Sequence, residues 1–497
     1  MTTALGMLPG PAGAAPIAQK IDWKPCPKND PLAGSALKGL ECGTLRVPLD
    51  YARPDGEKVT LALTRARHTA PHSQGVVLLN RGGPGAQGRD MPAIFTQMLP
   101  KDVTGSYDWI GYDPRGVGAS KPSLMCDPKY QNPGHAKPDA IPANAAEEQA
   151  WLRKARAYAD DCMAKYGKVL PHMGTRDWVR DLDAIRAALG EQRINYFGYS
   201  YGTYLGAAYA TAYPERVRRM VLDSVVRPSG VWYANNLDQN VAFEKRIHAF
   251  YRWIARHHAT YRLGRSGEAV ASAYARVRAA LKARPLKGKL GPTELDDMIL
   301  TDGYIDQLWP SHAHALSAFA VRKDPRPLLK AFRPPEWVDL NNYSVYSAVQ
   351  CRDAAWPRRW AVWHADNWRL YRSGYRFETW GNAWYNAPCA FWGVPGGPPP
   401  RIGGTLRTPP MLLIQSTEDA ATPYSGAVET HRLFPTSRLI VQDGGGNHGI
   451  SVRGDKCLDG AVIAYLRDGV LPQSRPGPDA VCAAGAPPKP KAAKKAR

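Results

Sequence analysis

The sequence predicts an α/β fold in which a mostly parallel central sheet is interrupted by a large helical insertion. Residues 75–80 and 410–414 are short, nearly continuous apolar runs, which are typical of strands buried on both faces of a sheet. Between residues 228 and 404 such runs disappear, and amphipathic helical patterns at 242–257 and 269–283 take their place. A chain of 497 residues also exceeds the usual size of one core, which favours a main domain with an insertion.

These patterns divide the chain into five segments. We expect a core built from two separate stretches, a helical cap between them, an N-terminal remnant of an export signal, and a basic, disordered tail. Residues 14–18 (Ala-Ala-Pro-Ile-Ala) resemble the end of such a signal, although its usual charged start and apolar centre are missing. The expected segments are residues 1–25 (N-terminal segment), 26–227 (first part of the core), 228–404 (cap), 405–484 (second part of the core) and 485–497 (tail).

The chain is strongly basic, with a formal net charge of +21 at pH 7. A nucleic-acid-binding protein would place such charge in a basic patch or stripe. Here the arginines are scattered through expected helices, so we favour a solvated basic surface and no nucleic-acid partner. Electrostatic attraction to an anionic cell envelope is an expected consequence. No apolar run of about 18 residues or more is present, and we therefore expect no membrane span.

The cysteines lie in four local groups, and none has the C-x-x-C spacing of a zinc or redox site. Eight cysteines allow 105 pairings, so the sequence leaves the connectivity open. The even number and the close spacing within each group predict four disulfides and an oxidising compartment, and hence a secreted protein. Buried free thiols in a cytosolic enzyme are the alternative. The groups are Cys26 and Cys42, Cys126 and Cys162, Cys351 and Cys389, and Cys457 and Cys482.

The most informative motif is Gly-Tyr-Ser-Tyr-Gly at residues 198–202. It follows an apolar strand pattern at 194–197 and precedes a helix rich in small residues at 203–212. A sharp turn between strand and helix exposes the hydroxyl of the central serine above the sheet, and the flanking glycines let neighbouring backbone pass closely. We therefore expect Ser200 to be a catalytic nucleophile. An ordinary glycine-rich turn is the alternative interpretation.

A serine hydroxyl needs a base, and the base needs an acid that orients it. In folds with this turn, the acid and then the histidine follow the serine along the chain. His448 lies in a glycine-rich loop, whereas His431 lies in an expected helix, so we predict that His448 is the base. Asp419 and Glu418 both follow the apolar run at 411–414. We favour Asp419 as the acid because it begins a turn.

The negatively charged oxygen formed during acyl transfer needs backbone N–H donors. One donor should be Tyr201, directly after the nucleophile, and the other should come from the loop after the strand that ends at Asn80. Residues 81–85 (Arg-Gly-Gly-Pro-Gly) form that loop and contain enough glycine for a close approach. This machinery implies no metal and no cofactor.

Together, five motifs make the chain resemble the secreted bacterial tripeptidyl aminopeptidases, relatives of the prolyl aminopeptidases within the α/β-hydrolase fold. The likeness extends from residues 47–51 to the segment with Cys457 and Cys482. It implies an α/β-hydrolase core with a cap that limits access to the site. The motifs are residues 81–85, 113–120 (Asp-Pro-Arg-Gly-Val-Gly-Ala-Ser), 198–202, 419–423 (Asp-Ala-Ala-Thr-Pro) and 446–449 (Gly-Asn-His-Gly).

The resemblance also implies the roles of individual residues. The chain departs from the family pattern at two positions. Asn80 is followed by Arg81, where a histidine or asparagine usually precedes the paired glycines, and Asn447 stands where glycine is commoner. The implied roles are nucleophile for Ser200, acid for Asp419, base for His448, and oxyanion donors for the backbone of Tyr201 and Gly83.

The resemblance implies a serine exopeptidase that releases short peptides, expected to be tripeptides, from substrates with free N-termini. Such an enzyme needs a carboxylate that binds the ammonium group of the substrate. We favour Glu244, which begins an amphipathic helix early in the cap, and include Asp353; Asp302 and Asp306 are further candidates. A solvated charge is the alternative for each of them. A carboxylesterase or lipase with the same triad is the nearest alternative function, and a non-catalytic envelope protein is a rival of a different class.

Overall fold

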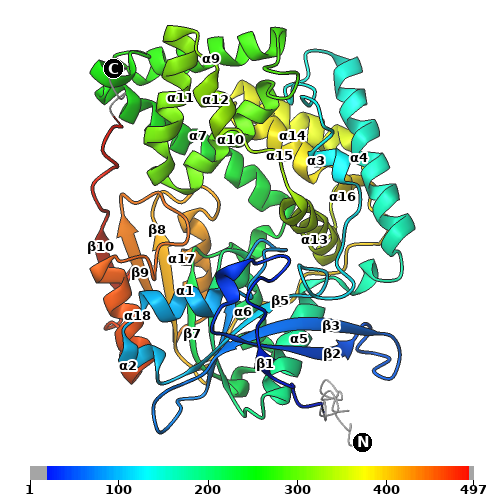
Figure 1. The fold of residues 1–497 in the computed structure, drawn as a ribbon, viewed down its shortest axis with the longest axis vertical. Coiled ribbons are helices and arrows are strands. Elements are labelled where there is room, and N and C mark those ends of the chain that lie inside the picture. Colours follow the sequence, from blue (N-terminus) through cyan, green and yellow to red (C-terminus); the bar gives the residue numbers. More distant parts are fainter. Residues whose placement is uncertain (1–18, 492–497) are drawn as a thin grey trace, which may run out of the picture.

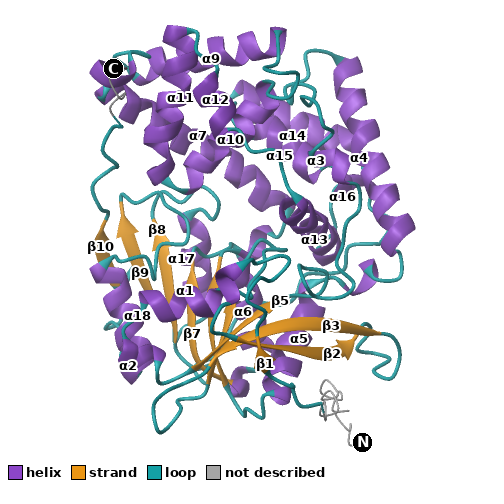
Figure 2. Ribbon diagram, in the orientation of Figure 1, coloured by secondary structure: helices purple, strands orange, loops and turns teal. Residues whose placement is uncertain are grey.

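Within residues 19–491, which the computed structural model describes, ten strands form one sheet in the order β1-β2-β3-β5-β4-β6-β7-β8-β9-β10 (Figure 2). The β1–β2, β2–β3 and β3–β5 pairs are antiparallel, and the other pairs are parallel. The expectation of a mostly parallel sheet is confirmed. The strands are β1 (Lys24–Pro25), β2 (Glu41–Pro48), β3 (Lys58–Ala66), β4 (Val76–Asn80), β5 (Asp108–Asp113), β6 (Ile194–Tyr199), β7 (Val217–Asp223), β8 (Met411–Ser416), β9 (Arg438–Asp443) and β10 (Ala480–Ala483).

Helices cover both faces of the sheet, as the side chains of β4 illustrate. Val77 and Leu79 pack in one apolar cluster with residues of α1 and α18, whereas Val76 and Leu78 pack in another with residues of α5 and α6. Every residue of β4 is buried, which explains why the strand reads as a continuous apolar run. The core helices are α1 (Met91–Met98), α2 (Lys101–Thr104), α5 (Thr175–Ala188), α6 (Tyr201–Ala212), α17 (Tyr424–Leu433) and α18 (Lys456–Asp468), with 3₁₀ helices η1 (Ser35–Leu37), η2 (Leu170–His172) and η3 (Pro214–Arg216).

Between β7 and β8 the chain forms a helical cap, which lies over one end of the sheet (Figure 1). The cap has an apolar cluster of its own, in which Phe250 and Trp253 of α7 pack with Val270 of α9 and Trp309 of α11. Its helices are α7 (Tyr233–Arg256), α8 (His258–Tyr261), α9 (Gly267–Ala283), α10 (Pro292–Tyr304), α11 (Trp309–Arg322), α12 (Arg326–Ala331), α13 (Trp337–Asp353), α14 (Trp360–Arg372), α15 (Thr379–Asn386) and α16 (Pro388–Phe391), with η4 (Pro228–Gly230) and η5 (Asp306–Leu308).

Two helices that precede the expected cap boundary at residue 228 also lie among the cap helices: α3 (Pro128–Gln131) and α4 (Ala145–Tyr166) (Figure 1). The Trp151 ring of α4 stacks on Trp384 of α15, with 5.5 Å between the ring centres. The Tyr130 hydroxyl of α3 donates a hydrogen bond to the Trp384 carbonyl at 2.7 Å. The group of helices that lies over the sheet is therefore built from two separate stretches of chain, one before β6 and one between β7 and β8.

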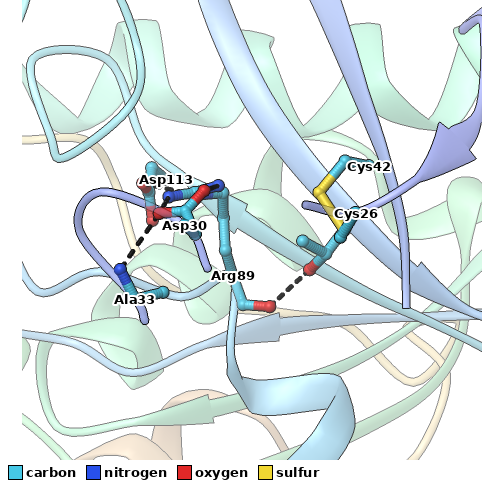
Figure 3. The surroundings of a disulfide bond; sticks show 7 residues. Cys26, Asp30, Ala33, Cys42, Arg89 and Asp113 are labelled. Atoms are coloured by element: carbon cyan, nitrogen blue, oxygen red, sulfur yellow. Dashed lines mark hydrogen bonds and ion pairs between the residues drawn. A yellow bond between two sulfur atoms is a disulfide. The ribbon is translucent and has the colours of Figure 1, made fainter. Parts of the chain in front are cut away.

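The structure contains all four expected disulfides, and each joins the two cysteines of one local group. Figure 3 shows the Cys26–Cys42 bond and, in its surroundings, Arg89, whose guanidinium is 2.9 Å from the Asp30 carboxylate and 3.0 Å from the Asp113 carboxylate. Four disulfides are typical of proteins that fold in an oxidising compartment. The structure thereby settles the connectivity that the sequence left open: Cys26 is bonded to Cys42, Cys126 to Cys162, Cys351 to Cys389, and Cys457 to Cys482.

Part of the expected tail contacts the cap helices, and residues 492–497 lie outside the described part of the chain. The indole N–H of Trp253 donates to the Pro488 carbonyl at 3.0 Å, and the Lys491 N–H donates to the Tyr261 hydroxyl at 3.1 Å. Residues 485–491 therefore lie along the cap, and residues 14–18 lie outside the described part of the chain. None of the helices within residues 19–491 has the length and apolar character needed to cross a membrane.

Candidate active site

Ser200 occupies the turn between β6 and α6, as the motif predicts. Its backbone has φ 56° and ψ −125°, a conformation that residues other than glycine rarely adopt. The Ser200 N–H donates to the Asp223 carbonyl of β7 at 3.0 Å, which holds the turn against the sheet. The side chain is half-buried at the start of α6, whose N-terminal N–H groups favour negative charge nearby.

Glycines surround this turn because other backbone passes too close for a side chain. A Cβ on Gly82 would lie 2.4 Å from the Tyr199 carbonyl and 2.9 Å from the Cβ of Ser200. A Cβ on Gly198 would lie 2.5 Å from the Gly202 carbonyl. Such distances are far below van der Waals contact, so the glycines let the residue 81–85 loop lie against the nucleophile.

His448 and Asp419 form a hydrogen-bonded pair beyond the carboxyl ends of β9 and β8. His448 Nδ1 lies 2.8 Å from Oδ2 and 3.1 Å from Oδ1 of Asp419. The carboxylate is 2% exposed, and it accepts hydrogen bonds from the N–H groups of Ala421 and Thr422 and from the Thr422 hydroxyl, at 2.9, 3.0 and 2.9 Å. These bonds hold the carboxylate in place and leave it facing the imidazole.

The loop after His448 is fastened to a buried aspartate that the sequence reasoning missed. Asp223, at the end of β7, accepts from the N–H groups of Ile450 and Ser451 at 3.2 and 2.7 Å. The neighbouring Ser224 hydroxyl accepts from the Gly449 N–H at 2.7 Å. Burial raises the pKa of the Asp223 carboxyl group. The only sequence signal was an acidic residue directly after an apolar strand.

The two alternative triad residues point elsewhere. His431 lies on α17, and its Nδ1 lies 2.8 Å from the Ser437 hydroxyl. Glu418 lines a different cavity from the one that contains Ser200, and its N–H donates to the Gly445 carbonyl at 2.8 Å. Ser200 and His448 thus line one cavity, and His448 is hydrogen-bonded to Asp419.

Two backbone N–H groups are available for an oxyanion beside Ser200. Among the described residues, the N–H groups of Tyr201 and Gly83 have no hydrogen-bond acceptor. Both residues line the same cavity as Ser200. A Cβ on Gly82 would also lie 3.2 Å from the Tyr201 nitrogen, so the two donor segments are in contact. This arrangement suits an oxygen that gains negative charge during the reaction.

A cavity of 890 Å³ contains Ser200 and His448 and lies between the core and the cap. The cap contributes several tyrosines to its walls, among them Tyr304 of α10, Tyr346 of α13 and Tyr385 of α15. Within residues 19–491, no group of three or more His, Cys, Asp and Glu side chains is arranged to hold a metal ion.

The four cap carboxylates considered from sequence are absent from the described lining of this cavity. Glu244 accepts from the N–H groups of Arg376 and Phe377 at 2.6 and 2.7 Å, so it holds a cap loop. Asp353 accepts from the Thr175 N–H at 2.6 Å and is buried.

The remaining two candidates, Asp302 and Asp306, are also engaged within the protein. Asp302 pairs with Nδ1 of His312 at 2.9 Å. Asp306 Oδ1 accepts from the side-chain amide of Asn447 at 3.1 Å. Position along the chain could not separate these structural carboxylates from a ligand-binding one.

Glu378, which sequence reasoning missed, is the carboxylate that best fits a cationic ligand. It lies immediately before α15 and lines the cavity that contains Ser200. Among the described residues its side chain has no hydrogen-bond or ion-pair partner, whereas Asp238 and Asp297 in the same cavity pair with Arg227 and Lys137. Burial, together with the nearby charges of Asp297 and Asp296, raises the pKa of Glu378 well above its ordinary value. An incoming ammonium group would favour its charged form.

The protonation state of His448 predicts how the rate depends on pH. Burial lowers the pKa of the imidazole, but the adjacent Asp419 carboxylate outweighs this effect and raises the pKa above its ordinary 6.5. A base must be neutral to accept a proton, so kcat/KM is expected to fall about tenfold per pH unit below that pKa. The measurement uses an acyl ester without ionisable groups, since the amine of a peptide titrates at about pH 8. A constant rate down to pH 5 would contradict the assignment.

Comparisons with known proteins agree with this geometry. Residues 75–308 match a family described as "alpha/beta hydrolase fold", and residues 375–482 match one described as "TAP-like protein". The chain is 41% identical over 491 residues to a tripeptidyl aminopeptidase of Streptomyces coelicolor, covering 96% of this chain and 89% of the relative. It is 32% identical to the serine protease Hip1 of Mycobacterium tuberculosis, covering 92% and 91%.

A further relative carries a different name. The chain is 31% identical to a Mycobacterium tuberculosis protein named carboxylesterase B, over 93% of this chain and 90% of the relative. The mostly parallel sheet and the cavity with Ser200 are what the α/β-hydrolase family match predicts. The identity to the Streptomyces protein extends over nearly the whole chain. The chain belongs to the tripeptidyl aminopeptidase family of serine hydrolases with the α/β-hydrolase fold.

Proposed function

We propose that this protein is a secreted serine exopeptidase that releases tripeptides from the free N-termini of peptides. The observation that carries the proposal is the cavity between core and cap, which holds Ser200 and His448 together with the unpaired carboxylate of Glu378. A nucleophile with its base accounts for acyl transfer, and a partly buried carboxylate without a partner among the described residues accounts for the requirement for a free amine.

In the proposed reaction, the Ser200 hydroxyl attacks the scissile carbonyl carbon while His448 accepts its proton. Asp419 holds the imidazole with Nδ1 as the donor and stabilises the imidazolium. The carbonyl oxygen becomes negative and accepts hydrogen bonds from the N–H groups of Gly83 and Tyr201. His448 then protonates the leaving amine, and the acyl-enzyme remains. Water, deprotonated by the same imidazole, attacks the ester and releases the N-terminal fragment.

The family relationship supports a fragment of three residues, because the chain is 41% identical over 491 residues to a tripeptidyl aminopeptidase. Glu378 lines the same cavity as Ser200, where its carboxylate would bind the ammonium group of a short peptide.

Replacing Glu378 by glutamine tests this assignment. Loss of a charge-assisted hydrogen bond worth about 1.5–3 kcal/mol should lower kcat/KM for a free peptide by about 10- to 100-fold. Hydrolysis of an acyl ester should not change, since the ester has no ammonium group. Glu268→Gln, at an exposed position of the cap, is the matched control, and its effect should be small. An equal loss of kcat/KM on the peptide and on the ester would show that Glu378 acts on the fold instead.

The function itself is tested with one peptide in two forms, free and N-acetylated, and with an acyl ester. Mass spectrometry should detect release of three-residue fragments from the free peptide alone. Release of dipeptides would correct the length. Hydrolysis of the ester with no cleavage of either peptide would favour the carboxylesterase alternative, which uses the same triad. Secretion is tested by the presence of the protein in the culture medium, and envelope association by its release at high salt.

A further inference from the structure

The loop that carries His448 is hydrogen-bonded to the cap as well as to the core. The His448 N–H donates to the Tyr304 carbonyl, at the end of α10, at 2.9 Å. The Asn447 side chain forms two hydrogen bonds with Asp306. Its Oδ1 accepts from the Asp306 N–H at 2.8 Å, and its Nδ2 donates to the Asp306 carboxylate at 3.1 Å. The base of the triad is therefore attached to residues 304–306 of the cap.

A buried arginine supports the Asn447–Asp306 pair. Arg246 of α7 is 6% exposed, and its guanidinium lies over the Trp309 ring, 4.7 Å from the ring centre. Its Nη2 lies 3.5 Å from Asn447 Oδ1 and 3.9 Å from the Asp306 carboxylate. Asp306 and Asn447 are only partly buried. The buried cation beside them favours the orientation in which the Asn447 oxygen and the Asp306 carboxylate face it, so groups of the cap favour one geometry of the pair.

Glycine at position 446 lets the histidine loop approach this arginine. A Cβ on Gly446 would lie 2.4 Å from the central guanidinium carbon of Arg246. The next residue, Asn447, makes both side-chain hydrogen bonds to Asp306. A glycine there could make neither bond to Asp306, so the side-chain link to the cap depends on the residue that this chain carries.

We propose that Asn447 and Asp306 are positioning residues that couple the position of the cap to that of His448. The cap supplies walls of the cavity that contains Ser200. A ligand that fixes the position of the cap relative to the core would therefore also fix the position of residues 304–306. Through their hydrogen bonds it would fix the position of the His448 imidazole. The inference rests on the proposed function only in so far as Ser200 and His448 react together; it does not depend on the substrate being a peptide.

The first test removes the link without adding charge. Asn447→Gly should lower kcat by about 10- to 100-fold, as expected when a catalytic group is misplaced by about 1 Å, with KM within about threefold. Asn144→Gly, at the exposed residue directly before the first turn of α4, controls for the backbone effect of a new glycine. The rate at which a fluorophosphonate labels Ser200 is measured in parallel. Labelling reports on the Ser200–His448 pair even if no peptide is cleaved.

The second test exchanges the two side chains. Asn447→Asp alone places two carboxylates opposite each other and should lower kcat and the labelling rate as Asn447→Gly does. Adding Asp306→Asn lets the new carboxylate accept from the residue 306 N–H and from the new amide, with the net charge restored. The double variant should recover both rates to within about threefold of the original protein, which a loss of folding could not do. A double variant no faster than Asn447→Asp, or an unimpaired Asn447→Gly, would overturn the proposal.

Discussion

Replacing Ser200 by alanine is expected to lower kcat for peptide hydrolysis by about 10⁶-fold. The Ser200 hydroxyl is the proposed nucleophile, and Ser200 lines one cavity with His448 and with Gly83 and Tyr201, whose N–H groups are the proposed oxyanion donors. The fold should be unaffected, because alanine meets the same backbone requirement at φ 56°. Product formation by mass spectrometry gives the rate, and the thermal midpoint of unfolding reports on the fold.

The control for this variant is Ser229→Ala, which removes an exposed serine hydroxyl that donates to Glu429 at 2.7 Å. Its activity should equal that of the original protein. The Ser200→Ala protein should still bind a free peptide more tightly than the N-acetylated form, because Glu378 is intact. Residual hydrolysis above about one thousandth of the original rate would show that another nucleophile acts.

Replacing Asp419 by asparagine is expected to lower kcat by about 10⁴-fold. The N–H groups of Ala421 and Thr422 both donate to Oδ1 of residue 419, so an asparagine will place its oxygen there. Its NH₂ group then faces Nδ1 of His448, which must accept instead of donate. The ring proton moves to Nε2 in most molecules, and only the small fraction with the proton on Nδ1 can still take the proton of Ser200.

The measurement is a pH profile of kcat/KM on the acyl ester, with Glu418→Gln as the matched control. The Asp419→Asn profile should have its acid limb at lower pH, since the carboxylate that raises the pKa of His448 is gone. The Glu418→Gln variant should stay within about threefold of the original rate. Similar losses in the two variants would argue against Asp419 as the orienting acid.

Local sequence was sufficient for strands β4, β6 and β8 and for choosing the three candidate triad positions. A strand buried on both faces must be a continuous apolar run, as in β4 and β8. The turn at residues 198–202 needs glycines wherever neighbouring backbone comes within 3 Å of a would-be Cβ. These requirements are met by adjacent residues, so they are visible in the chain. The close spacing within each cysteine group likewise anticipated the four disulfides.

The carboxylates of the cap show where local sequence was insufficient. The sequence pattern placed Glu244 at the start of a helix, but it lies in the middle of α7, whereas Glu378 lies immediately before α15. Nothing beside these two residues in the chain distinguishes their roles. Glu244 is occupied by two backbone N–H groups more than 100 residues away, at Arg376 and Phe377. Glu378 lies in the cavity with no partner among the described residues. Their roles differ because of contacts that form only when the cap folds.

The sequence by itself was enough to infer the turn that presents the nucleophile and the order in which acid and base follow it. Both depend on residues that are neighbours in the chain. Only the tertiary structure decided which helices complete the cap, where residues 485–491 lie, and that Asn447 bonds to Asp306. Each of these depends on contacts between segments that are distant in the chain. The physical reason is that the role of a charged or amide side chain depends on its hydrogen-bond and ion-pair partners. The packing of the whole chain determines which partners lie within reach.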